Sequence, residues 1–159
     1  MRDEDSWTPA ALVLAYPALH PVVPPLSPGL VEAVATLPDL LRFLPHDFAE
    51  IRRNYLGGPE SGADGYAMPG LAVLEGLCPT VVVNAEYDDL RASGEKFVAS
   101  LAQAGVDVRQ VTASGMLHAF LMLPDSVAPA REARELFAET VRRAATRLAV
   151  AADAVLEDA

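Results

Sequence analysis

The stretch PTVVVNAEYDDLRASGEKFVASLAQAGVDVRQV, at Pro79–Val111, predicts most of the fold. It opens with three consecutive valines at 81–83, a β-branched run typical of a strand buried in a parallel sheet. A helix is expected next, because the apolar residues within Phe97–Leu101 recur at helical spacing and Gly105 stands where a glycine commonly ends a helix. The alternation of valine with polar residues over 106–111 then predicts a second strand, nearer the edge of the sheet.

Weaker signals surround this stretch. The continuous apolar run at 10–17, AALVLAYP, predicts a strand buried on both faces. Residues 18–79 are rich in proline and predict a loop-rich insertion over a site, with two or three short helices interrupted at Pro38 and Pro45. A loop, GMLHAFLMLP, then leads to a long amphipathic helix near the C-terminus, whose expected apolar stripe includes Leu136, Phe137, Val141, Ala145 and Leu148.

The order strand, insertion, strand, helix, strand, loop, helix is that of an α/β protein with right-handed crossovers. We therefore expect one α/β domain over residues 1–159, with about three parallel strands and flanking helices. Residues 80–150 form its regular part, a strand, a helix, a strand and a helix in succession.

Composition excludes several function classes. Twelve Lys and Arg residues against 22 Asp and Glu residues give a net charge of −10, which disfavours nucleic acid and anionic membranes as partners. The longest uncharged stretch, 6–31, contains six prolines and cannot be a membrane-spanning helix. The acidic N-terminal segment 1–7 lacks the order of a signal peptide, and the single cysteine, Cys78, is expected to be buried rather than reactive. These features predict a cytoplasmic protein.

Two residues are candidates for catalysis. Asp88 follows the valine-rich strand and His118 follows the next one. Because parallel strands lie about 4.8 Å apart and end at the same edge of a sheet, these two side chains can meet. A carboxylate that accepts the imidazole Nδ1–H fixes the tautomer of a general base. The alternative is structural, with Asp88 as a helix N-cap and His118 as a loop residue.

The sequence around these residues resembles the α/β-hydrolase superfamily, specifically the hormone-sensitive-lipase-like esterases (alpha/beta hydrolase fold-3). NAEYDDLRASGEKFVASLAQAGVDV followed by GMLHAF is similar to that group's pattern, roughly A-E-x-D-P-L-R-D-E-G, a helix, A-G-V, a strand and G-x-x-H-G-F. AALVLAYPAL resembles the family strand that follows the nucleophile helix. The resemblance covers the C-terminal half of a full-length member. It implies that Asp88 is the triad acid and His118 the general base of a carboxylic-ester hydrolase.

The chain departs from the family pattern at two positions beside these residues. Asp89 stands where the family usually has proline, and it is expected either to cap the following helix, the interpretation we favour, or to compete electrostatically with Asp88. Ala119 stands where the family usually has glycine, a change that is unfavourable only if the backbone there needs a positive φ.

A larger departure is the missing nucleophile. None of the chain's serines (6, 27, 61, 93, 100, 114 and 126) lies in a G-x-S-x-G elbow, and the family's H-G-G-G oxyanion loop is also missing. Both elements are expected before the point where this sequence begins. Ser114 is close to His118 in sequence, but the family does not use its position for attack. The isolated chain is therefore expected to be catalytically incomplete.

No cofactor and no metal are expected. His20 and His46 each adjoin proline and are predicted to face solvent, and neither has a spacing to other residues that fits a metal site. The expected partner of complete relatives is a small-molecule ester. Three hypotheses stay open for this chain: the acid and base half of an esterase, a non-catalytic interaction module, or a truncated gene product. The second predicts a homo-oligomer or docking on a complementary N-terminal chain.

Overall fold

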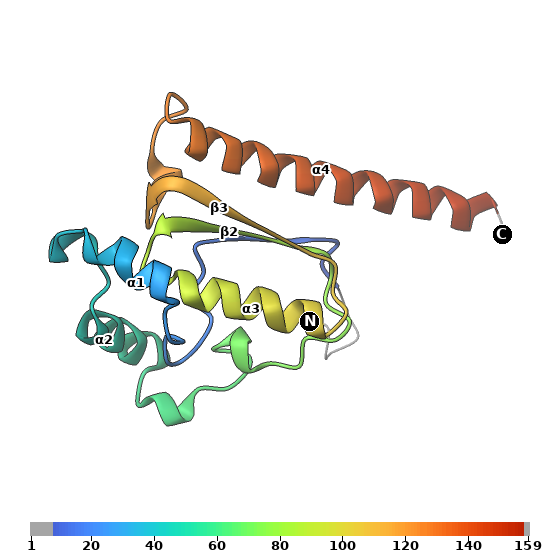
Figure 1. Ribbon diagram of the computed structural model, residues 1–159. Coiled ribbons are helices and arrows are strands. Elements are labelled where there is room, and N and C mark those ends of the chain that lie inside the picture. Colours follow the sequence, from blue (N-terminus) through green and yellow to red (C-terminus); the bar gives the residue numbers. More distant parts are fainter. Residues whose placement is uncertain (1–7, 158–159) are drawn as a thin grey trace.

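The computed structural model describes residues 8–157 and shows a parallel sheet between two helical layers (Figure 1). Helix α4 covers one face of the sheet and α3 covers the other. The elements run in the order β1 (Leu12–Ala15), α1 (Pro28–Ala35), η2 (Asp39–Leu41), α2 (Pro45–Leu56), η3 (Glu60–Gly62), η4 (Pro69–Leu71), β2 (Thr80–Tyr87), α3 (Arg91–Gln103), β3 (Val108–Leu117), η5 (Phe120–Met122) and α4 (Ala128–Glu157).

The three strands are all parallel and lie in the order β1-β2-β3. Leu12 pairs with Thr80, and Thr80 pairs with Val108, so β2 is the central strand. Each successive strand is reached by a crossover, through the insertion after β1 and through α3 after β2. This arrangement confirms the predicted α/β class with three parallel strands.

Alternation along β2 divides the core into two parts. Val81, Val83 and Ala85 pack with Ala130 and Ala133 of α4 on one face. On the other face, Phe97 and Leu101 of α3 form a second cluster with Val106, Leu19 and Leu74. Helix α3 approaches β2 closely at Gly94, where an added Cβ would collide with the buried Asn84 side chain. A glycine is therefore required at this contact.

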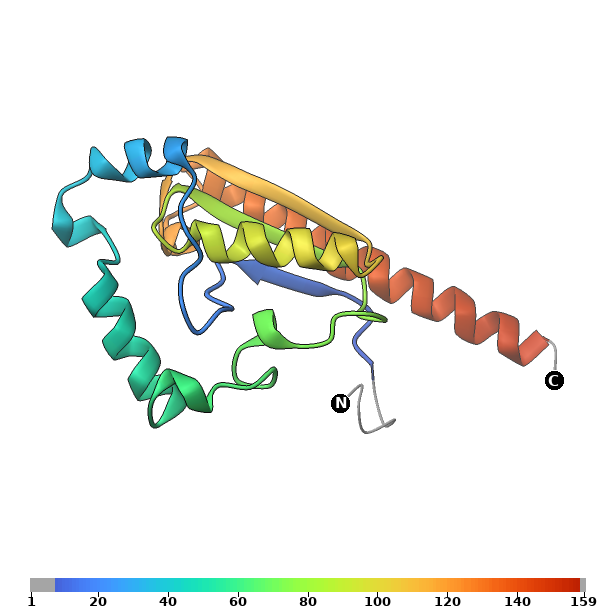
Figure 2. The same ribbon diagram turned by 60° about the horizontal axis from the view of Figure 1, so that its bottom comes forward.

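The predictions for β1, β3 and α4 need correction. β1 is half-buried rather than fully buried, because it forms an edge of the sheet among the described residues. β3 continues through Leu117, so the expected loop begins three residues later than the sequence suggested. In α4, Leu136 and Phe137 pack against the core, whereas Val141 and Leu148 are exposed. The C-terminal half of this helix projects past the sheet (Figures 1 and 2).

The insertion has the predicted interruptions, since α1 ends before Pro38 and α2 begins at Pro45. It wraps around the α3 side of the sheet, with α1 beside the left end of α3 and α2 lower in Figure 1. In the described part of the chain, no helix is long and apolar enough to cross a membrane. The acidic segment 1–7, on which the signal-peptide prediction rests, lies outside the described residues.

The prediction that His20 faces solvent is wrong. Its side chain is buried, with 4% of the residue exposed, and Nδ1 lies 2.8 Å from Ser93 Oγ on α3. The Ser93 hydroxyl also accepts the Leu19 N–H at 2.8 Å, so this contact ties the start of the insertion to α3. His46, in contrast, is exposed as predicted, with 77% of its side chain accessible.

Burial of His20 predicts a pH-dependent stability. Burial, with a smaller contribution from the charge of Lys96, lowers the pKa of His20 below its ordinary value of 6.5. The unfolded chain then binds a proton at His20 more readily than the folded chain does. The contribution of neutral, buried His20 to the free energy of unfolding is therefore complete above the pKa of His20 in the unfolded chain, and it is lost as the pH falls below that value. Urea unfolding from about pH 7.5 to about pH 5.5 should show a His20-dependent decline of at most about 1.4 kcal/mol per pH unit.

The His20→Gln variant should lose this part of the pH dependence. The matched His46→Asn variant should keep it, because His46 is solvated in both states. Equal slopes for the wild type and His20→Gln would contradict the assignment.

Candidate active site

Asp88 and His118 come together where β2 and β3 end. His118 Nδ1 lies 2.8 Å from Asp88 Oδ2; the carboxylate side chain is fully buried and the imidazole is 26% exposed. The expected contact between the two residues is therefore present. With Nδ1–H donated to the carboxylate, Nε2 carries the lone pair and can accept a proton.

The second oxygen of Asp88 makes a local contact. Oδ1 accepts the backbone N–H of Leu90 at 2.9 Å, and Leu90 is the N-cap residue of α3. Such a bond from an aspartate to the backbone two residues on forms a turn that commonly precedes a helix. Asp88 thus supports the start of α3 with one oxygen and contacts His118 with the other. The turn fixes the orientation of the carboxylate against the imidazole.

β3 contains a bulge directly before His118. Ala85 pairs with Ala113 and Tyr87 pairs with Leu117, so β3 contains two more residues than β2 over this interval. The Glu86 carboxylate holds the bulge, because Oε2 accepts the Gly115 N–H at 2.6 Å and the Ser114 hydroxyl at 2.9 Å. These two bonds lower the pKa of Glu86. The sequence signal for the bulge was a glycine inside a strand pattern, and Gly115 has a φ of +73°.

Two aromatic rings contact the His118 imidazole. The Tyr16 ring centroid lies 4.6 Å away and the Phe43 centroid lies 4.7 Å away, with the Phe43 ring edge-on. Burial and the nearby charge of Asp88 raise the pKa of Tyr16. Tyr16 follows β1 with an unusual φ of +37°. The sequence indicated that Tyr16 lies at a strand end, because it stands between an apolar run and Pro17. Nothing in the sequence indicated that Phe43 belongs to the site.

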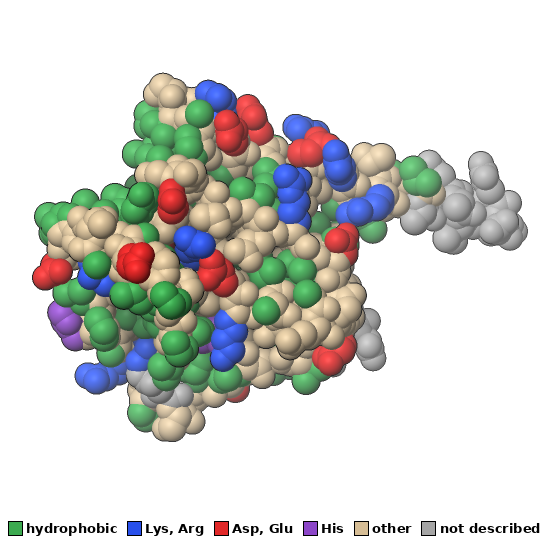
Figure 3. Space-filling view, in the orientation of Figure 1, with side chains coloured by type: hydrophobic (Ala, Val, Ile, Leu, Met, Phe, Trp, Pro, Cys, Tyr) green, Lys and Arg blue, Asp and Glu red, His purple; other side chains and the backbone are tan. Residues whose placement is uncertain are grey.

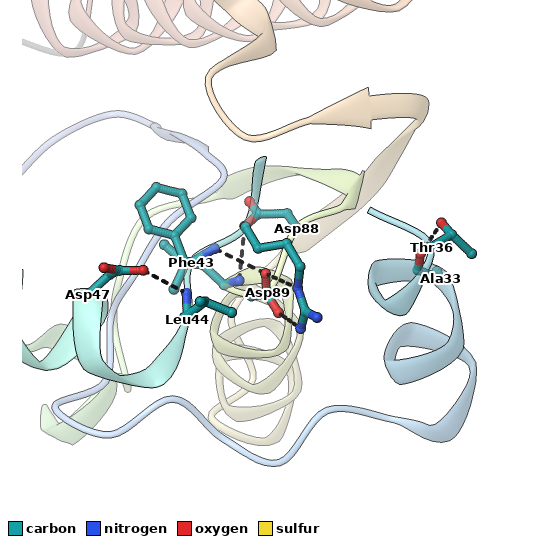
Figure 4. A network of polar contacts seen from close by, with 9 residues as sticks. Ala33, Thr36, Phe43, Leu44, Asp47, Asp88 and Asp89 are labelled. Carbon is teal, nitrogen blue, oxygen red and sulfur yellow. Dashed lines mark hydrogen bonds and ion pairs between the residues drawn. The ribbon is translucent and has the colours of Figure 1, made fainter. Parts of the chain in front are cut away.

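Asp89 contacts the insertion. Its Oδ1 accepts from Arg42 Nη2 at 2.8 Å, and its Oδ2 accepts from the Phe43 backbone N–H at 3.1 Å (Figure 4). The N-cap residue of α3 is Leu90, which makes no side-chain capping bond, so the prediction that Asp89 caps the helix is wrong. Instead, Asp89 ties the insertion to the end of β2.

No serine of the described residues is hydrogen-bonded to His118. Ser114 donates to Glu86, and Ser93 is buried against His20. Ser6 lies outside the described residues. In the same described part, no group of three or more His, Cys, Asp or Glu residues could hold a metal ion. Cys78 is buried, and burial raises the pKa of its thiol.

Comparisons with known proteins define the class of the chain. The sequence pattern of the family described as alpha/beta hydrolase fold matches residues 1–122. The chain belongs to this family, in the group of hormone-sensitive-lipase-like esterases. A search of curated protein sequences found no match.

Solved structures of esterases share the fold. An esterase from Pyrobaculum calidifontis superposes with a TM-score of 0.74 at 29% identity over 91% of this chain and 46% of the esterase. EstE1, a thermophilic carboxylesterase from a metagenomic library, gives 0.68 at 33% identity over 85% and 45%. An esterase from Rhizomucor miehei gives 0.67 at 31% identity over 87% and 43%. The chain thus spans less than half the length of these relatives.

The residue after His118 predicts a stabilising substitution. Ala119 has a φ of +62°, a left-handed conformation that is unfavourable for a residue with a Cβ. Ala119→Gly should therefore raise the free energy of unfolding by up to about 1 kcal/mol. Ala99→Gly, on the exposed face of α3, is the matched control and should lower it by about 1 kcal/mol. Urea unfolding measures both, and a destabilised Ala119→Gly variant would contradict the interpretation.

Proposed function

We propose that this chain supplies the acid and the base of the Ser-His-Asp triad of a carboxylic-ester hydrolase, and that the serine lies outside these 159 residues. The observation that carries the proposal is the 2.8 Å contact between a fully buried Asp88 carboxylate and a partly exposed His118 imidazole. Membership of an esterase family supports it.

The two residues have distinct roles in ester hydrolysis. His118 Nε2 takes the proton of the serine hydroxyl as that oxygen attacks the ester carbonyl, and the proton then goes to the departing alcohol. Water hydrolyses the resulting acyl-enzyme by the same proton transfers in a second cycle, which releases the acid and regenerates the serine. Asp88 holds the Nδ1–H tautomer and stabilises the imidazolium that forms in each step.

The open edge of β1 is the place where a nucleophile-bearing segment would bind. Among residues 8–157, β1 pairs only with β2, so its other edge is free for a further strand. An apolar groove of about 930 Å³ adjoins it, lined by Leu12, Leu71, Val73, Leu77 and Phe97 among others. The proposed occupant is the complementary N-terminal half of an α/β-hydrolase, since the solved relatives are more than twice as long as their matched part.

Reconstitution tests this assignment. The isolated chain should neither hydrolyse p-nitrophenyl acetate above the buffer rate nor be labelled on serine by a fluorophosphonate. Mixing it with the part of EstE1 that this chain does not match, where the proposal places the serine elbow, should produce ester hydrolysis. Asp88→Asn should then reduce kcat by roughly 10³- to 10⁴-fold, since it stabilises the wrong tautomer.

A matched pair of histidine variants controls the experiment. His118→Asn should abolish the reconstituted hydrolysis, and His46→Asn should leave it unchanged because His46 lies exposed on α2. Robust His118-dependent turnover or serine labelling of the isolated chain would contradict the absence of a nucleophile. A reconstituted activity that does not depend on His118 would contradict its role as the base.

A second candidate function is a non-catalytic interaction module. Its support is the number of large apolar side chains on the surface, many of them over the α1–α2 region (Figure 3). They include Val31, Leu40, Leu41, Ile51 and Tyr55. Light scattering tests the self-association that this function predicts, and a compact monomer would argue against it.

A further inference from the structure

Asp89 and Arg42 join two parts of the chain that are 47 positions apart in the sequence. Arg42 donates through Nη2 to Oδ1 at 2.8 Å and through Nε to Oδ2 at 3.3 Å, which is a bidentate ion pair. The two side chains are 23% and 10% exposed. The bond to Asp89 raises the pKa of Arg42, which supports a charged pair. This contact fastens the insertion to the end of β2.

The same carboxylate also holds the backbone of the next residue. Asp89 Oδ2 accepts the Phe43 N–H at 3.1 Å, so Asp89 fixes both the side chain of Arg42 and the main chain of Phe43. Phe43 lies between η2 and α2, in a segment without regular structure. Because a charged acceptor holds the Phe43 amide, the backbone of Phe43 is fixed, and this restricts the orientations of its own ring.

The Phe43 ring contacts the candidate base, and the residue also lines a cavity. Its centroid lies 4.7 Å from that of His118 at an interplanar angle of 73°. The cavity, of about 440 Å³, has a mixed lining that includes Phe48 as well as the charged Arg42 and Asp89. Phe43 therefore links the Asp89–Arg42 pair, through its backbone N–H, to the imidazole of His118, through its ring.

We propose that Asp89 is a positioning residue that, through Arg42 and the Phe43 amide, holds the Phe43 ring against His118 and shields the imidazole from water. This inference rests on the proposed role of His118 as the base. The ion pair has a further effect, because Arg42 neutralises Asp89. Asp88 is then the carboxylate whose charge acts on His118, although Asp89 is its neighbour in the sequence.

The shielding can be measured by acylation of His118 with diethyl pyrocarbonate. The full chain is treated at about pH 8, and the rate at each histidine is followed by peptide mass spectrometry. Asp89→Ala and Phe43→Ala should each accelerate acylation of His118 by about threefold or more, because both remove the cover. Asp89→Asn should accelerate it less, since an amide oxygen can still accept the Phe43 N–H.

Internal controls separate this effect from general loosening. Acylation of exposed His46 should stay constant in every variant. Glu95→Gln breaks an ion pair whose arginine is as exposed as Arg42, between Arg91 and Glu95 on α3, and should leave the His118 rate unchanged. If Asp89→Ala does not fold, Arg42→Gln removes the same ion pair from its more exposed partner. It should also accelerate acylation, but less than Phe43→Ala does, because Asp89 can still accept the Phe43 N–H.

A spectroscopic signature completes the test. The Phe43 ring current should displace the His118 ring proton resonances, and Phe43→Leu should abolish that displacement. Asp89→Ala should shift these resonances in the same direction as Phe43→Leu. Wild-type acylation and wild-type shifts in the Asp89 and Arg42 variants would overturn the inference. If the variants expose His118 as predicted but the reconstitution experiment yields no hydrolysis, the proposed function is contradicted and the positioning role of Asp89 is not.

Discussion

The parallel pairing of β2 with its two neighbours is the constraint on which the candidate site depends. Parallel strands end at the same edge of a sheet, so the residues after β1, β2 and β3 meet there although 102 positions separate Tyr16 from His118 (118 − 16 = 102). Tyr16, Asp88 and His118 each follow a different strand. The bulge in β3, whose backbone is hydrogen-bonded to Glu86, adds two residues to this strand before His118, and His118 then contacts the Asp88 carboxylate.

The neighbouring aspartates show how local surroundings separate two identical side chains. Asp88 is fully buried and contacts a histidine, whereas Asp89 contacts an arginine and a backbone amide of the insertion. A carboxylate paired with a guanidinium is neutralised locally and has little remaining influence on a third group. The two adjacent acids at the end of one strand thus have different partners, a histidine for Asp88 and the insertion for Asp89.

The sequence predicted the parts of the fold that depend on local patterns. Three valines, a helical repeat and a C-cap glycine were enough for β2 and α3, and the strand ends placed Asp88 beside His118. Contacts across the insertion could not be predicted, because nothing near Arg42 or Phe43 indicates a partner 46 or 47 positions away. The burial of His20 was missed for the same reason, since Ser93 lies 73 positions further along. Ala119 was recognised as unusual, but its positive φ required the structure.

Among residues 8–157, one edge of β1 has no neighbouring strand, which bears on how the proposed partner would be selected. Residues 12–15, LVLA, contain no charge and no proline, and their register with β2 is regular, so the edge lacks the features that usually prevent further strand pairing. Backbone amides and carbonyls are the same in every polypeptide, so this edge accepts strands without regard to sequence. The backbone edge alone cannot distinguish a correct half-domain from any other extended segment. Selectivity must therefore come from side chains in the adjoining groove, such as Leu12 and Phe97, which would contact the residues that follow the added strand.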